Sequence, residues 1–242
     1  MPNFDQSDAA PGGPETLPEP LPADPLPLFE AWFDEALERR LQPNPNAMTV
    51  ATLGPQGELS ARIVLCKGYD LRAGYVEFYT NGQSRKGAAL AANPRAALLF
   101  HWDALDRQIR IEGPVSRVPP AKADEYFASR HPLSRVGAWA SAQSEPIGSR
   151  DAFDEKVRAA AARFGVDLAA IAQPGAPDVA IPRPAHWGGW RVWAERVELW
   201  IGRAGRIHDR ALWTRELRPT GDEDLAFSAA GDGAWRVSRL QP

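Results

Sequence analysis

Cationic side chains stand beside small polar ones at residues 81–86, which read Asn-Gly-Gln-Ser-Arg-Lys. A glycine turn leads there into a helix with Ser84 as the expected N-cap, followed at once by Arg85 and Lys86. The first N–H groups of a helix have no intrahelical acceptor, and two cations add positive charge beside them. The pattern suits a phosphate group, with a capped helix carrying solvated charges as an equal alternative.

A second cationic cluster lies at residues 206–210, which read Arg-Ile-His-Asp-Arg. In a strand, the period of two places Arg206, His208 and Arg210 on one face. Cationic or titratable groups that share a face repel one another unless an anion or a cavity faces them. The cluster therefore indicates a second anion site, and a solvated barrel exterior is the alternative.

A third group consists of Tyr126, Arg130 and Ser134, spaced at i, i+4 and i+8. These residues share a helix face only if the helix continues past Pro132. Because proline breaks helices, we expect the three side chains to converge around a turn instead. A guanidinium beside two hydroxyls is again suited to phosphate.

Several other kinds of site are excluded by residue types. The four histidines, at 101, 131, 186 and 208, lack metal-ligand spacing with acids, and the sequence has no glycine-rich nucleotide motif and no nucleophile elbow. Cys66 is the single cysteine, so an intrachain disulfide and a multi-cysteine zinc site are impossible. We expect Cys66 to be a small buried hydrophobe in a strand, and we expect no metal.

These residues must be positioned by short strands and a few helices. Apolar residues recur at helical spacing from Leu28 to Leu41, which predicts an amphipathic helix. Further helices are expected at 84–92, 120–130 and 150–164, and strands at 48–53, 59–67, 74–80, 96–102, 108–112, 191–199, 206–213 and 235–240. Close spacing and Gly/Pro turns favour antiparallel pairing. The predicted fold is an antiparallel barrel of six to eight strands with helices packed outside it.

Length and charge limit the organisation of the chain. The 242 residues, 44% of them hydrophobic, fit one large domain. Residues 1–27 hold eight prolines and five acids but no Lys or Arg, so we expect a disordered tail at 1–20 and one domain at 21–242. The net charge of −3 argues against a nucleic-acid partner. No leader or long apolar run is recognised, which favours a cytoplasmic protein without membrane attachment.

Six co-linear stretches resemble one family. They are RIVLCK (62–67), FYTN..SRK (78–86), NPRAALLFHWDALDRQIRIEG (93–113), YFASR...S..GAWAS.QS (126–144), WGG.RV (187–192) and E.W.....R.HDR (198–210). With the Leu-Pro-Ala-Asp-Pro stretch at 21–25 and a terminal RL.P, they cover about residues 21–242. Their order and spacing resemble the pyridoxine (pyridoxamine) 5′-phosphate oxidases, which are FMN enzymes that make pyridoxal 5′-phosphate. The resemblance implies an FMN-binding split barrel that works as a homodimer, with the flavin at the subunit interface.

The resemblance also implies a role for individual residues. FMN would be held by Arg62, Ile63, Val64, Leu65, Cys66, Lys67, Tyr79, Thr80, Arg85, Lys86, Gln108, Gln143, Ser144, Trp200 and Arg210. The substrate would be held by Lys67, Tyr126, Arg130, Ser134, Arg206, Ile207 and His208, with Arg206 and His208 as the catalytic pair. Two phosphate groups, one on the flavin and one on the substrate, would account for more than one cation cluster.

The implied reaction is FMN-dependent oxidation of pyridoxamine or pyridoxine 5′-phosphate to pyridoxal 5′-phosphate, with O2 reduced to H2O2. The sequence departs from the family at Leu199, Ile201, His131 and Arg135, where an aromatic residue, Gln, Pro and Gln are usual. An Arg/Tyr-bearing segment often found upstream of residue 21 is also absent. Two alternatives stay open: an oxidase of another small aromatic substrate, as in phenazine pathways, and a non-catalytic flavin- or vitamer-binding barrel.

Overall fold

Strand β6 (Arg107–Arg117) belongs to both halves of a split antiparallel barrel. The computed structural model describes residues 15–173 and 179–242. Residues 107–112 of β6 pair with β8 (Arg196–Ile201), whereas residues 115–117 pair with β7 (Trp187–Trp193). The change of partner occurs at Gly113, where a Cβ atom would overlap the carbonyl oxygen of Trp193. Glycine therefore permits the close approach at which the barrel divides.

Ten strands within the described residues form one curved sheet, in the order β12-β9-β8-β6-β5-β1-β2, with β7 joining β6 to β4 and β4 pairing with β3. The remaining strands are β1 (Ala47–Leu53), β2 (Leu59–Leu65), β3 (Gly68–Asp70), β4 (Tyr75–Asn81), β5 (Arg95–Trp102), β9 (Asp209–Thr214) and β12 (Arg236–Leu240). Every pairing is antiparallel, as the sequence predicts. A separate hairpin of β10 (Leu217–Pro219) and β11 (Phe227–Ala229) was not predicted.

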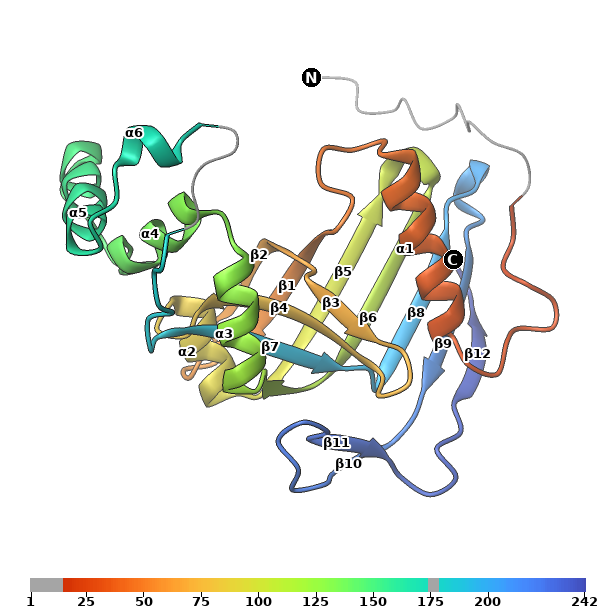
Figure 1. Cartoon of the computed structure of the whole chain (residues 1–242). Helices are drawn as coiled ribbons and strands as arrows, with labels where there is room; N and C mark the ends of the chain where they lie inside the picture. The colour runs from red at the N-terminus through yellow and green to blue at the C-terminus, as the bar shows by residue number, and fades with distance from the viewer. Residues whose placement is uncertain (1–14, 174–178) are drawn as a thin grey trace.

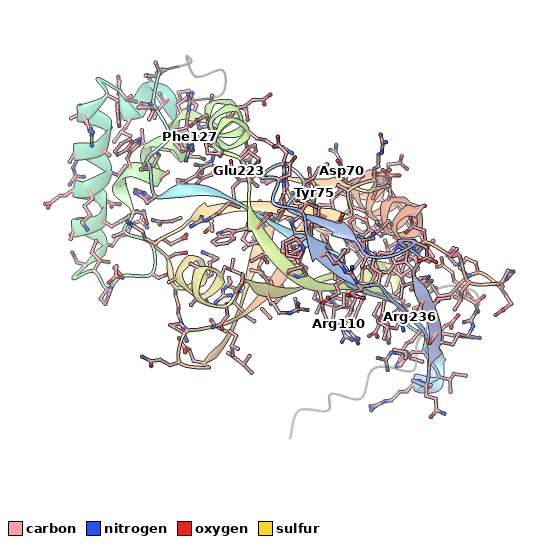
Figure 2. The ribbon with its side chains drawn as sticks, turned by 90° about the horizontal axis from the view of Figure 1, so that it is seen from below. Asp70, Tyr75, Arg110, Phe127, Glu223 and Arg236 are labelled. Atoms are coloured by element: carbon pink, nitrogen blue, oxygen red, sulfur yellow. The ribbon has the colours of Figure 1, made fainter. Side chains whose placement is uncertain are left out.

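Helix α1 (Leu26–Arg39) supplies the centre of the core and confirms the predicted amphipathic helix. It crosses one face of the sheet (Figure 1), where Phe29 and Phe33 lie 5.6 and 5.7 Å from the ring of Phe100 on β5. Side chains alternate along β6, so Ile109 is buried under the helix. Figure 2 shows Arg110, the next residue, on the face of the sheet away from α1.

The other helices lie around the barrel. They are α2 (Arg85–Ala92), α3 (Pro120–Ser129), α4 (Pro132–Ala140), α5 (Arg150–Arg163) and α6 (Leu168–Ile171), with short 3-10 turns at Asp103–Leu105 and Ala204–Arg206. Helices α4 to α6 form a small cluster at the far end from α1 (Figure 1) and have a hydrophobic core of their own. In the described part of the chain no helix combines the length and apolarity needed to cross a membrane.

Three predicted strands differ from the structure. The strand expected at 108–112 continues as β6 to Arg117, because its second half pairs with β7. The expected strand at 191–199 is divided into β7 and β8, because β7 pairs with β4 while β8 pairs with β6 and β9. The expected strand at 206–213 begins only at Asp209. Arg206 ends a 3-10 turn with φ 59, next to Gly205 at φ 67, so the chain is not extended there. The prediction that Arg206 and His208 share a strand face with Arg210 was therefore wrong.

The predicted tail also differs at its end. Residues 1–14 lie outside the described residues, but residues 15–20 pack against the barrel. Leu17 is 2% exposed, and its N–H donates to Asp209 Oδ2 at 2.8 Å. Glu15 pairs with Arg107, and Glu19 with Arg239 at 2.8 Å. Two of the five acids that suggested disorder, Glu15 and Glu19, thus have arginine partners on the folded sheet, which sequence composition alone does not reveal.

Candidate functional site

A cavity of about 520 Å³ lies between β2, β4 and helices α2, α3 and α4. Its walls combine cationic, hydroxyl and aromatic side chains. They are formed by Ile63, Val64, Leu65, Lys67, Tyr79, Thr80, Asn81, Lys86, Tyr126, Arg130, Ser134, Gly137, Ala138, Ser141, Gln143 and Trp187. Two of the three clusters predicted from the sequence, at 81–86 and at 126–134, therefore meet in one cavity.

One end of the cavity is built by the start of α2. Ser84 caps the helix as expected, its hydroxyl accepting the N–H of Gly87 at 3.3 Å. Lys86 reaches back from the first turn and donates to Thr80 Oγ1 and to Gln143 Oε1, both at 2.9 Å. The N–H of Arg85 donates to the Ser144 hydroxyl at 3.2 Å. The end of strand β4 and a distant loop thus both bind the ammonium group that the first turn of α2 supplies.

Within the described residues, no acidic side chain forms a hydrogen bond or an ion pair with Lys86. Burial, together with the nearby Arg62 guanidinium, lowers the pKa of Lys86 to about 8. Burial and the charge of Arg85 also lower the pKa of Arg62. A shift in this direction shows that the folded chain disfavours the added positive charge. An anion placed here would remove that penalty.

The other end is built by the break between α3 and α4. Helix α3 ends at Ser129 and α4 begins at Pro132, which confirms that proline interrupts the helix. Arg130 lies in the break, with its guanidinium 4.7 Å from the centre of the Trp187 ring. Its Nη1 atom is buried and makes no hydrogen bond within the described residues, and burial lowers its pKa. A desolvated guanidinium with a free donor is suited to bind an anion.

Between the two ends stands an aromatic wall. Tyr79 stacks on Tyr126 with ring centroids 4.2 Å apart, and on Trp187 with centroids 5.4 Å apart. Gly189 makes this arrangement possible, because a Cβ atom there would lie 2.8 Å from the Tyr79 ring. The ring planes make angles of 13° to 29° with one another, and all three residues line the cavity.

Some lining residues were not assigned a role from the sequence. Trp187 stands inside the quoted stretch WGG.RV, so this stretch held the signal, whereas Asn81 already belonged to the predicted 81–86 cluster. Gly137, Ala138 and Ser141 come from α4 and its C-terminal end, and they stand inside the quoted stretch YFASR...S..GAWAS.QS, which likewise held the signal. Of the predicted cofactor residues near the cavity, Arg62, Cys66, Arg85 and Ser144 do not line it.

Cys66 is 4% exposed, and its thiol donates weakly to the Gly68 carbonyl at 3.5 Å. Burial raises the pKa of this thiol to about 12, so the thiolate is strongly disfavoured. The prediction of a small buried hydrophobe is confirmed, but the prediction that it lies in a strand was wrong, because β2 ends at Leu65 and Cys66 belongs to the link to β3.

The remaining predicted site residues lie elsewhere on the chain. Gln108, Trp200, Arg206, Ile207, His208 and Arg210 do not line the cavity. Gln108, Trp200 and Arg210 are neighbours on three paired strands, and the ring of Trp200 lies 4.6 Å from that of His208. Strand β8 stands four places from β2 in the sheet, about 19 Å along its curve at about 4.8 Å per strand. The chain therefore holds two separate groups of candidate residues.

Comparison with known proteins links both groups to one family. A family model described as pyridoxamine 5′-phosphate oxidase matches residues 33–164, which include the whole cavity except Trp187. The chain belongs to the pyridoxamine 5′-phosphate oxidase family. A second model, the pyridoxine 5′-phosphate oxidase C-terminal dimerisation region, matches residues 187–242 and so includes the second group except Gln108.

Relatives named pyridoxine/pyridoxamine 5′-phosphate oxidase match this family member over nearly their full length. The protein from Gluconobacter oxydans is 49% identical over 92% of this chain and 96% of its own. That from Burkholderia multivorans is 45% identical over 99% of this chain and 94% of its own.

Solved structures of the family share the split-barrel fold. PhzG from Burkholderia lata, in complex with tetrahydrophenazine-1-carboxylic acid, has a TM-score of 0.73 and 25% identity, over 91% of this chain and 94% of its own. A pyridoxamine 5′-phosphate oxidase-related, FMN-binding protein from Nostoc punctiforme has a TM-score of 0.62 and 16% identity, over 88% of this chain and 97% of its own.

Proposed function

We propose that the protein oxidises pyridoxamine 5′-phosphate or pyridoxine 5′-phosphate to pyridoxal 5′-phosphate with FMN as cofactor. The observation that carries the proposal is the pair of cationic ends in one cavity, Lys86 at α2 and Arg130 at the α3–α4 break, with an aromatic wall between them. FMN and the substrate each bring one phosphate group, and the two ends offer one anion site to each. The names of relatives at 45–49% identity support the same substrates.

The residues of the α2 end fit an FMN phosphate. Lys86 and Thr80 offer an ammonium and a hydroxyl, Gln143 and the first N–H groups of α2 complete a polar cradle, and the lowered pKa of Lys86 reflects an uncompensated charge. When bound, FMN would accept two electrons from C4′ of the substrate and pass them to O2, forming H2O2. With the amine as substrate, water enters and ammonia leaves, which balances the reaction.

The residues of the α3–α4 break fit the substrate phosphate. Arg130 has a free buried donor, and Tyr126, Ser134 and Lys67 line the cavity around it. The phosphate group is remote from C4′, so binding it would hold the reacting carbon in place without a contact to that carbon.

The second group of residues is proposed to complete the site of a partner subunit in a homodimer. Trp200, Arg206, His208 and Arg210 lie in the region that matches the family's C-terminal dimerisation model. The outer strand β2 also leaves apolar surface available, with Leu59 80% and Ile63 65% exposed. Arg206 and His208 would then orient the substrate ring from across the interface.

The likeness to PhzG favours one second candidate, oxidation of a phenazine precursor. Its identity to this chain is 25%, against 45–49% for the relatives named as B6 oxidases. The buried free donor of Arg130 further favours a phosphorylated substrate.

An absorption experiment tests the proposal directly. Purified protein reconstituted with FMN is mixed with pyridoxamine 5′-phosphate without oxygen, then exposed to air while H2O2 and pyridoxal 5′-phosphate are measured. We expect the flavin absorption to bleach and both products to appear. Bound flavin that neither phosphorylated vitamer bleaches would favour the non-catalytic barrel. Bleaching by tetrahydrophenazine-1-carboxylic acid alone would favour the phenazine-type activity.

A further inference from the structure

A buried charge cluster lies directly beside the aromatic wall. Glu77, on β4, is 2% exposed. Its two carboxylate oxygens lie 3.0 and 3.1 Å from Lys122 Nζ on α3, and Oε2 lies 3.4 Å from Arg191 Nε on β7. The Tyr79 hydroxyl donates to Oε1 at 3.4 Å. One carboxylate therefore joins a helix and two strands, although it does not line the cavity.

The cluster lies next to the candidate substrate residues, two residues earlier along β4 and four residues earlier along α3. In the β4–β7 register Glu77 is opposite Arg191, and Tyr79, two residues further along β4, is opposite Gly189. On α3, Lys122 and Tyr126 are four residues apart and so share a helix face. The Lys122–Glu77 contact and the Tyr126–Tyr79 stack are thus successive contacts between the same helix and the same strand.

The outer side of the cluster is also fixed. Arg191 lies with its guanidinium 4.4 Å from the centre of the Tyr75 ring, at the start of β4 (Tyr75 is labelled in Figure 2). Its Nη1 atom donates to the Asp224 carbonyl at 2.6 Å, in the loop of the β10–β11 hairpin. Arg191 is 3% exposed, so its guanidinium is held inside the protein beside the Glu77 carboxylate. Glu77 is held from the sheet side, and Lys122 ties α3 to it.

Burying a carboxylate carries a large desolvation cost, and apolar side chains can fill the same volume without it. The benefit of a buried carboxylate at Glu77 is geometric, because a charge-assisted contact has a defined direction and length. Burial, the charge of Glu77 and the hydrogen bond between Tyr79 and Glu77 all raise the pKa of Tyr79, so the Tyr79 hydroxyl remains a donor to the carboxylate.

We propose that Glu77 is a positioning residue that, through Lys122 and Tyr79, sets the orientation of α3 relative to β4 and thereby the substrate-binding side of the cavity. The inference rests on the proposed function, since it concerns how Tyr126 and Arg130 meet the substrate phosphate. Arg130 follows Tyr126 by four residues at the end of α3, so a small tilt of the helix displaces its guanidinium. The Lys86 end of the cavity belongs to α2 and does not depend on this contact.

The test compares Lys122→Met with Lys122→Arg in the FMN-loaded enzyme. Lys122 is partly exposed, so the methionine variant is expected to fold. We expect Lys122→Met to raise both KM for pyridoxamine 5′-phosphate and Kd for pyridoxal 5′-phosphate by about fivefold or more, because misplacement of a binding group weakens ligand binding. Values of kcat and of Kd for FMN should stay within about twofold. Lys122→Arg, which keeps the charge, should restore the parent values.

Glu125→Gln is the matched control, since Glu125 is exposed on the same helix and its substitution also removes one charge. It should leave KM and both dissociation constants unchanged. Glu77→Gln should reproduce the effect of Lys122→Met, and the double variant should be little worse than either single variant, because the two side chains act through one contact. Independent, multiplying effects of the two substitutions would contradict the proposal.

A purely structural role gives a different result. If Lys122→Met lowers Tm while KM and the Kd for pyridoxal 5′-phosphate stay at parent values, the cluster stabilises the fold and does not position the site. That outcome, in a parent enzyme that oxidises pyridoxamine 5′-phosphate, overturns this inference alone. A parent protein that neither oxidises pyridoxamine 5′-phosphate nor binds pyridoxal 5′-phosphate overturns the proposed function as well.

Discussion

Nη2 of Arg210 lies 2.7 Å from Oε1 of Glu198, a carboxylate that is 3% exposed on the neighbouring strand. Glu198 also pairs with Arg110, on the face of the sheet away from α1 (Figure 2). A residue expected to bind FMN is therefore held on the outer face of the barrel, outside the cavity of its own subunit. Under the proposed function, Arg210 would contact the flavin in the cavity of a partner subunit.

Arg210→Met should weaken FMN binding without unfolding the subunit. Glu198 keeps its contact with Arg110, so the substitution does not leave a buried carboxylate unpaired. We expect loss of about 1.5–3 kcal/mol of flavin binding, the usual contribution of a charged hydrogen bond. The flavin-to-protein ratio after gel filtration measures the effect, and a parent-like ratio would remove Arg210 from the flavin site.

Lys86→Met tests the cofactor end of the cavity. Removing a charge-assisted contact to the phosphate should lower FMN affinity by roughly 10–150-fold, as measured by quenching of flavin fluorescence. Lys156→Met, on the exposed face of α5, is the control and should bind FMN as the parent does. Unchanged affinity in Lys86→Met would place the phosphate elsewhere.

The pH dependence of the flavin-free protein should report the same lysine. Because the pKa of Lys86 falls from 10.5 to about 8 in the folded chain, the unfolded state binds more protons between these values. The free energy of unfolding should therefore rise with pH from about 8 to 10.5, and this rise should be smaller in Lys86→Met. FMN affinity should change in the opposite direction and decrease above pH 8, since only the ammonium form attracts the phosphate. Denaturant titrations of both proteins across this range measure the difference.

Arg206→Met should separate substrate binding from flavin binding. Arg206 lies in the 3-10 turn before β9, and we expect its loss to leave an FMN-loaded dimer. A guanidinium that contacts the substrate mainly in the transition state should contribute about 3 kcal/mol, so kcat/KM should fall by about 100-fold or more. Oxidation of pyridoxamine 5′-phosphate at the parent rate would show that Arg206 does not meet the substrate.

Leu17→Ala should destabilise the fold, because residues 15–20 are packed against the barrel. Leu17 is 2% exposed within the main core, and truncating such a side chain costs about 2–5 kcal/mol. Urea denaturation measures the loss. Leu133→Ala is the control, since Leu133 is 41% exposed and should change stability little. Equal stability of both variants would mean that this segment does not dock in solution.

The sequence by itself determined the features that depend on residues close together in the chain. Ser84 as a helix cap, the break at Pro132 and the cations of 81–86 follow from backbone chemistry within one or two turns. The antiparallel strands likewise follow from short alternating runs joined by tight turns. The co-linear stretches were sufficient to recognise the family.

Only the tertiary structure decided which of these features meet. Tyr79 and Gly189 are 110 positions apart, yet the β4–β7 register places them opposite each other and lets Tyr126 stack between helix and sheet. The same holds for Leu17, whose partner Asp209 lies on β9. Strand register depends on the packing of the whole sheet, because a shift by one residue moves every side chain of the strand to the opposite face. For that reason the cavity, the buried Glu77 cluster and the separation of the two candidate groups appear only in the folded chain.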